Sequence, residues 1–84
     1  MGSYFVTFRS VTFAQKGESA LRNTGISCAL QRTPRWMEAQ GCGYCLKVRP
    51  QDGKQAVDVL RQKQVPFRKL YLQQEDGTVE EIVL

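Results

Sequence analysis

Three segments of the chain have the hydrophobic pattern of β-strands. Residues 4–9 (YFVTFR) are rich in β-branched and aromatic side chains, which is typical of a strand. Residues 26–33 (ISCALQRT) alternate apolar and polar positions, and residues 44–49 (YCLKVR) do the same. The pattern therefore predicts three strands, of which the second and third are half-buried.

Two other segments have the period of an amphipathic helix. In residues 11–25, apolar and small side chains recur on one helical face. Ser10 or Thr12 can cap the start of this helix, and Gly25 is suited to end it. The second predicted helix, residues 50–64, opens at a proline and has an apolar stripe made by Ala56, Val57 and Leu60.

The C-terminal segment adds two strands. Residues 65–74 predict the fourth strand, and the Asp-Gly pair at 76–77 predicts a tight turn into a fifth strand over residues 78–84. The elements then follow the order β-α-β-β-α-β with a terminal hairpin strand. Two right-handed β-α-β crossovers that place both helices on one face give a ferredoxin-like sandwich. We therefore predict a single α+β ferredoxin-like domain over residues 1–84.

The strand and helix periods agree on which side chains point between the sheet and the helices. These side chains are apolar or small, and their burial would supply the hydrophobic stabilisation of the domain. The predicted core consists of Val6, Leu21, Ile26, Cys28, Leu30, Leu46, Val48, Val57 and Leu60.

Composition narrows the class of protein. The chain has 84 residues, of which 42% are hydrophobic and 24% charged, and these values suit one small globular domain. The chain contains no apolar run long enough to span a membrane, and the N-terminal residues lack the pattern of a secretory signal. We therefore expect a cytoplasmic protein with reduced cysteines and no membrane contact.

The absence of histidine argues against several kinds of site. The chain has three cysteines and no histidine, so it lacks the usual base partner of a cysteine nucleophile and the commonest metal ligand. A zinc site made by Cys42, Cys45 and Cys28 would lack a fourth ligand, unless two chains pooled their C-x-x-C pairs. We predict no metal and no tightly held cofactor.

Cys42 and Cys45 form a C-x-x-C pair in the stretch GCGYCLKVRP, residues 41–50. One interpretation is structural, with two small residues near a turn. A thioredoxin-like redox site would need a helix after the first cysteine, whereas the residues here alternate like a strand. Because Cys42 lies between Gly41 and Gly43, a large protein donor can reach it, and this favours a sulfur carrier.

Cations near this stretch favour the same interpretation. Arg32 and Arg35 lie upstream of the cysteine pair, and Lys47 and Arg49 lie downstream. Positive charge near a thiol favours the thiolate, which is the reactive form. We predict Arg35 as the electrostatic helper, with Arg32 as the second candidate.

The three cysteines differ in expected reactivity. Cys42 should react fastest, because it is flanked by glycines. Cys45 lies on the strand face opposite Leu46 and is expected near the surface, where it could resolve an adduct on Cys42 as a disulfide. Cys28 alternates with core residues, so it should be desolvated and react slowest.

The mildly basic net charge of +4 leaves a second class of function open. Some RNA-binding modules share the predicted topology and carry aromatic side chains on their central strands. Here the basic residues are dispersed, and Tyr44 shares its face with Leu46 and Val48, so we expect no specific nucleic-acid binding. The alternative is a non-catalytic domain that binds a protein or RNA through its open sheet face.

Four motifs together carry a family resemblance. They are a first strand of the type YFVTFRS leading into a helix, the segment GISCALQRTPR, the Cys-Gly pair of GCGYCLKV, and a second helix after RPQD. With these motifs the chain resembles a family of small bacterial proteins described as selenium/sulfur carriers, over roughly residues 4–71. The family's T-P-R maps onto Thr33, Pro34 and Arg35, and its C-G maps onto Cys42 and Gly43.

The resemblance implies a carrier, rather than a turnover enzyme, that holds a persulfide or selenosulfide on Cys42. Arg32, Pro34, Gly41 and Gly43 are then expected to bind the incoming group. Cys45 and the terminal hairpin strand lie outside the family's pattern. The expected partners are a donor of the cysteine desulfurase type and a protein acceptor, and pairing of edge strands into a homodimer stays open.

Overall fold

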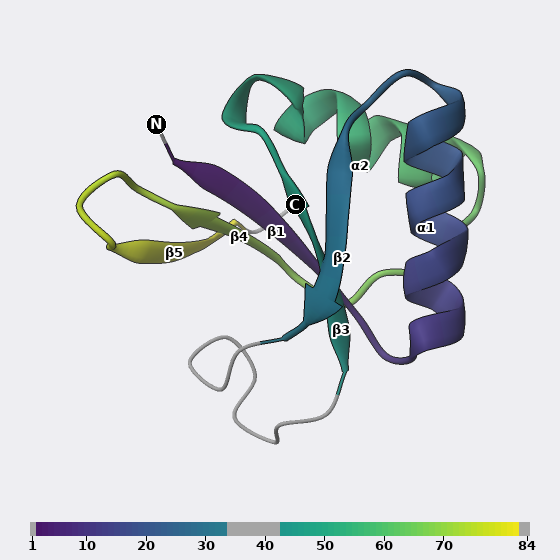
Figure 1. The fold of residues 1–84 in the computed structure, drawn as a ribbon, viewed down its shortest axis with the longest axis horizontal. Helices are drawn as coiled ribbons and strands as arrows, with labels where there is room; N and C mark the ends of the chain where they lie inside the picture. The colour runs from purple at the N-terminus through teal and green to yellow at the C-terminus, as the bar shows by residue number, and fades with distance from the viewer. Residues whose placement is uncertain (1, 34–42, 83–84) are drawn as a thin grey trace.

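The computed structural model describes residues 2–33 and 43–82 of the chain. Within these residues it has five strands and two α-helices, in an order that agrees with the sequence pattern (Figure 1). The strands are β1 (Ser3–Phe8), β2 (Cys28–Arg32), β3 (Tyr44–Val48), β4 (Leu70–Gln73) and β5 (Val79–Ile82). The helices are α1 (Val11–Asn23) and α2 (Gly53–Gln62), and a short 3-10 turn, η1 (Pro50–Asp52), leads into α2.

The five strands form one antiparallel sheet in the order β2-β3-β1-β4-β5. Strand β3 lies between β1 and β2, and strand β1 lies between β3 and β4. The edges of the sheet are therefore β2 and β5. The predicted α+β class is confirmed, with an antiparallel sheet and two helices.

Local sequence explains where the first helix begins and ends. Of the two predicted caps, Ser10 is the one used: its Oγ accepts a hydrogen bond from the backbone N–H of Phe13 at 3.4 Å. Thr12 lies inside the helix. At the other end Gly25 has φ +85°, a left-handed conformation that glycine adopts without steric cost, and the helix stops as predicted.

The second helix and the fourth strand begin later in the chain than the sequence pattern predicts. The segment from Pro50 begins as η1, where Arg49 forms an ion pair with Asp52 at 2.9 Å, and becomes α-helical at Gly53. Strand β4 begins at Leu70 rather than at Val65. Val65 instead donates its N–H to the carbonyl of Leu60 and ends the turn after α2, and Pro66 has no N–H to donate to a sheet.

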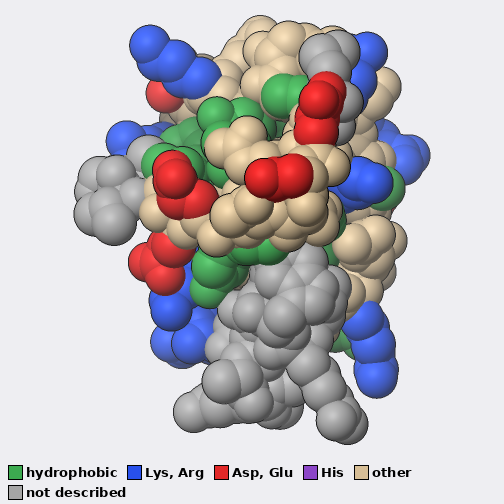
Figure 2. Space-filling view, turned by 90° about the vertical axis from the view of Figure 1, so that its left-hand side faces the viewer, with side chains coloured by type: hydrophobic (Ala, Val, Ile, Leu, Met, Phe, Trp, Pro, Cys, Tyr) green, Lys and Arg blue, Asp and Glu red, His purple; other side chains and the backbone are tan. Residues whose placement is uncertain are grey.

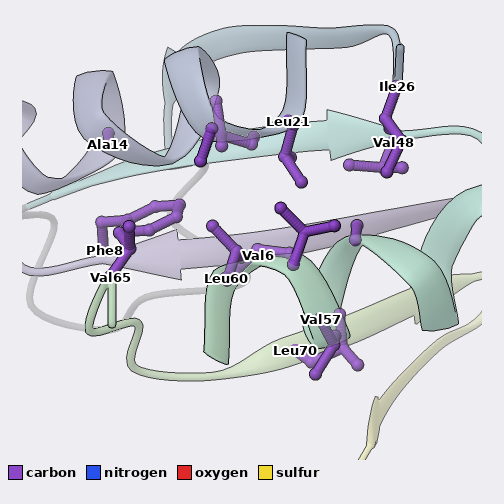
Figure 3. Packing of buried hydrophobic residues seen from close by; sticks show 14 residues of the cluster. Val6, Phe8, Ala14, Leu21, Ile26, Val48, Val57, Leu60, Val65 and Leu70 are labelled. Carbon is purple, nitrogen blue, oxygen red and sulfur yellow. The ribbon is translucent and has the colours of Figure 1, made fainter. Parts of the chain in front are cut away.

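The core lies between one face of the sheet and both helices (Figure 3). Seven of the nine predicted core residues are buried there, whereas Cys28 and Leu30 are only partly buried because β2 is an edge strand. The prediction missed other members of the core. These are Phe8, Ala14, Ala20, Ala56, Val59, Val65 and Leu70.

The opposite face of the sheet has a small cluster of its own. Phe5 of β1 and Cys45 of β3 are buried in it, and Tyr71 of β4 packs against them.

In the part of the chain that the structure describes, no helix is long and apolar enough to cross a membrane.

Candidate functional site

The ends of β2 and β3 meet at a junction formed by Thr33 and Gly43. The N–H of Thr33 donates to the carbonyl oxygen of Gly43 at 3.3 Å. Cys42 directly precedes Gly43 in the chain, so the sequence connects it to this junction. Of the predicted site residues, Pro34, Arg35, Gly41 and Cys42 lie outside the described residues.

Gly43 has a backbone conformation that other residues rarely adopt. Its φ is +121°, and a Cβ at this position would lie 2.8 Å from the carbonyl oxygen of Phe8. Phe8 is the last residue of β1 and pairs with Tyr44 of β3. The absence of a side chain at Gly43 therefore lets the chain after Cys42 pass directly over the end of β1.

We expect Gly43→Ala to destabilise the fold more than the control substitution Gly77→Ala. Both glycines have positive φ, so each substitution should cost about 1–3 kcal/mol in backbone strain. Only Gly43 also has a backbone atom in the way, because a Cβ at Gly77 meets nothing within 4 Å. Urea unfolding of the two variants measures the difference, and equal losses would show that the close approach at Gly43 is unimportant.

Cys45 lies in the middle of the sheet, next to the junction. It pairs with Thr7 of β1 and Gln31 of β2, and its relative exposure is 0%. Burial raises the pKa of its thiol, and the side chains of Gln31 and Thr33 oppose this rise in part. The hydroxyl of Thr33 is itself buried and has no hydrogen bond of ordinary geometry with a described residue. Cys45 is therefore a shielded, protonated thiol at neutral pH.

The expectation that Cys45 lies near the surface is wrong. Phe5 and Tyr71 fill the sheet face that alternation assigned to solvent, and Cys45 is buried with them.

Cys28 was expected to be desolvated, yet it is only partly buried. Burial raises the pKa of its thiol and Glu18 adds to the rise, whereas Arg22 lowers it. The two thiols belong to clusters on opposite faces of the sheet, so they do not form one site.

We expect Cys28 to be alkylated faster than Cys45 in the folded protein, which reverses the order drawn from the sequence. Both thiols have raised pKa values, so the rates of both should increase as the pH rises through 9, and access then decides between them. Peptide mass spectrometry after limited iodoacetamide treatment gives the two rates, with denatured protein as control. Labelling of Cys45 at the rate of Cys28 would contradict its burial.

The structure separates the predicted cations. Arg32 is exposed at the end of β2, pairs with Tyr44 and directly precedes the junction. Lys47 lies three residues beyond Tyr44 along β3, roughly 10 Å away at the rise of a strand. Arg49 lies farther still and is paired with Asp52. Of the three predicted cations that the structure describes, Arg32, Lys47 and Arg49, Arg32 therefore lies nearest to the junction of Thr33 and Gly43 along the strands.

Two arginines at this end of the sheet were not predicted as site residues from the sequence. Arg9 follows Phe8, whose carbonyl oxygen faces Gly43, and Arg68 donates its N–H to Thr7 at 2.8 Å. Arg9 and Arg68 are far apart in the sequence and belong to no common motif. They come together because β1 pairs with the segment before β4. Only the topology of the sheet could have indicated this.

These features define a small α+β protein in which a cysteine, Cys42, directly precedes the glycine of the junction between β2 and β3. Residues 3–72 match the family described as "Putative Se/S carrier protein-like", and the chain belongs to this family. The match includes the junction and ends in β4, so β5 lies outside it, as expected from the sequence. The chain matches no curated protein and no solved structure.

Proposed function

We propose that this protein carries sulfane sulfur or selenium on Cys42, as a persulfide or a selenosulfide. The observation that supports this most is the family match over residues 3–72. Gly43 adds to it, since a residue without a side chain leaves the approach to its neighbour open. We also propose that the protein works in the cytoplasm, where its thiols stay reduced.

The loading step needs no net oxidation. The thiolate of Cys42 attacks the outer sulfur of a donor persulfide, such as that of a cysteine desulfurase, and a new S–S bond forms. The S–S bond of the donor breaks, and the donor leaves as a thiolate that takes up a proton. Transfer to a protein acceptor repeats the same exchange in the other direction.

Neighbouring residues would assist this exchange. We propose that Arg35, and second to it Arg32, stabilise the thiolate of Cys42 by their positive charge. Arg32 is exposed and directly precedes Thr33 of the junction, which supports its part in this role. Pro34, Gly41 and Gly43 would shape the segment that receives the donor.

Cys45 would act only after loading. Its thiolate could attack Sγ of the Cys42 persulfide, form a Cys42–Cys45 disulfide and expel hydrosulfide, after which a thiol reductant must restore both thiols. The burial of Cys45 and the raised pKa of its thiol make this attack slow. We therefore propose that the persulfide lasts long enough to be handed to an acceptor.

We propose a ferredoxin-like sandwich extended by β5, since β3 lies between β1 and β2 while β1 lies between β3 and β4. In such a sheet an RNA-binding protein would use exposed rings. Here Phe5 is only 4% exposed, and Tyr44 packs against the helix-facing core, which weakens the alternative of an RNA-binding face.

The proposed function is tested by sulfur transfer. The protein is incubated with a cysteine desulfurase and free cysteine, and its intact mass is measured without reductant. The proposal requires the gain of one sulfur atom on the wild-type protein. A protein that gains no sulfur under conditions where the desulfurase itself becomes loaded would contradict it.

A further inference from the structure

A cavity of about 260 Å³ lies where β1 passes into α1. Its lining combines two cations with two aromatic rings and a proline: Arg9, Phe13, Pro66, Phe67 and Arg68. Arg9 follows β1, Phe13 is in the first turn of α1, and the other three precede β4. Two segments that are distant in the sequence, residues 9–13 and 66–68, therefore build this one small cavity.

Backbone hydrogen bonds hold these segments together. Thr7 accepts from the N–H of Arg68 at 2.8 Å and donates its own N–H to Lys69 at 2.9 Å. The hydroxyl oxygen of Thr7 also accepts from the N–H of Lys69 at 3.0 Å. Because Thr7 is buried in the sheet, this connection fixes Arg68 beside the end of β1, where the chain continues to Arg9.

The charges around the cavity suit an anion. Arg9 forms no ion pair with any acidic residue that the structure describes, and the first turn of α1 contains no acidic residue. Four of the eight acidic residues lie within positions 75–81, which contain no lysine or arginine. Figure 2 shows acidic side chains on the side of the molecule where the β4–β5 hairpin lies. The remaining surface is therefore more basic than the net charge suggests.

The shape and lining limit the size of the ligand. Pockets for drug-sized ligands usually enclose roughly 300–1,000 Å³, so this cavity suits a smaller molecule. Guanidinium groups bind carboxylates through paired N–H donors. The rings of Phe13 and Phe67, both half-buried, offer an apolar wall to the rest of the ligand.

We propose that this cavity binds a small organic carboxylate, of amino-acid size, with its carboxylate on Arg9 and Arg68 and its apolar part against Phe13 and Phe67. The site lies at the same end of the sheet as Gly43, since a Cβ at Gly43 would lie 2.8 Å from the carbonyl oxygen of Phe8, the residue before Arg9. The binding does not depend on sulfur transfer, so it can be tested separately from the proposed function.

The test is an NMR titration of the full chain with three probes: butyrate, 3-mercaptopropionate and 1-butanol. The two carboxylates should shift the ring signals of Phe13 and Phe67 along a saturable curve, and the alcohol should not. Shifts that do not saturate, or equal binding of 1-butanol, would overturn the proposal. A stronger effect of 3-mercaptopropionate than of butyrate would extend it to sulfur-bearing carboxylates.

Variants assign the binding to the arginines. Arg9→Gln and Arg68→Gln should each weaken butyrate binding by roughly 10-fold or more, because each removes charged hydrogen-bond donors. Both side chains are exposed, so the fold should persist, and Arg9→Lys provides a milder second variant that keeps the charge. Lys47→Gln removes one charge elsewhere on the sheet and should leave binding unchanged. Unaltered affinity in Arg9→Gln would contradict the proposed site.

Discussion

Replacing Leu60 by alanine should lower the free energy of unfolding by roughly 2–5 kcal/mol. Leu60 is 0% exposed and lies on the face of α2 that packs against the sheet (Figure 3). A Cβ at Gly17 of α1 would lie 3.2 Å from Leu60, 3.2 Å from Leu46 and 2.9 Å from Phe8, which places Leu60 where both helices meet the sheet. Truncation there removes apolar contacts from a fully buried position and leaves a cavity.

A control substitution to alanine at an exposed helical position separates the effect of burial on stability from that of placing alanine in a helix. Val11 lies in α1 and is 37% exposed, so Val11→Ala should change stability by no more than about 0.5 kcal/mol. Urea unfolding, followed by circular dichroism, measures both variants. If Leu60→Ala unfolded at the same urea concentration as the parent, the packing of α2 on this face would be wrong.

Replacing Cys42 by serine should abolish the uptake of sulfur from a cysteine desulfurase. The proposed carrier forms its persulfide on the Sγ of Cys42, and a serine hydroxyl cannot form the S–S bond. The mass of Cys42→Ser should therefore stay that of the unloaded protein, whereas the wild type gains one sulfur atom. Intact-mass spectrometry without reductant reads out the difference.

The other two cysteines supply the controls for that result. Cys28→Ser should load like the wild type, because Cys28 lies on the helix-facing side of β2. Cys45→Ser should also load, and at most the lifetime of the adduct should change, since Cys45 is buried beside Gln31. If Cys42→Ser took up sulfur at the wild-type rate, Cys42 would not be the residue that carries it, and the proposal for this residue would be wrong.

The sequence was sufficient to predict the order of elements because each element has a clear period. Alternation located β2 and β3, and the stripe of Ala56, Val57 and Leu60 located α2. The Asp-Gly pair does form the turn before β5, where Gly77 has φ +90°. The extent of β4 was beyond this reasoning, since it depends on pairing between distant segments.

The alternation of apolar and polar residues also led to the wrong prediction that Cys45 lies near the surface, whereas it is buried. A period of two assigns a residue to a face of the sheet, but it does not say what else lies on that face. Phe5 lies on β1, the strand next to Cys45, and is buried with it, and Tyr71 of β4 packs against this pair, although the helices cover the other face. Burial on the second face thus comes from cross-strand neighbours that a single segment cannot reveal.

The candidate site was predicted only in part. Gly43 and Arg32 lie where β2 ends and β3 begins, whereas Lys47 and Arg49 lie farther along the chain, and the roles of all four stay predictions. Arg9 and Arg68 were missed because their proximity depends on the hydrogen bonds of Thr7. The roles of Cys42, Arg35, Pro34 and Gly41 stay predictions, since these residues lie outside the described ranges.

The most direct test of the carrier proposal is to locate sulfur on the protein as it comes from the cell. The full chain is expressed and purified without reductant, its free thiols and persulfides are blocked, and its peptides are fragmented by tandem mass spectrometry, which separates Cys42 from Cys45. The proposal predicts an extra sulfur or selenium atom on the peptide that contains Cys42, and none on the peptide that contains Cys28. An extra sulfur found on Cys28 or Cys45 alone would contradict it.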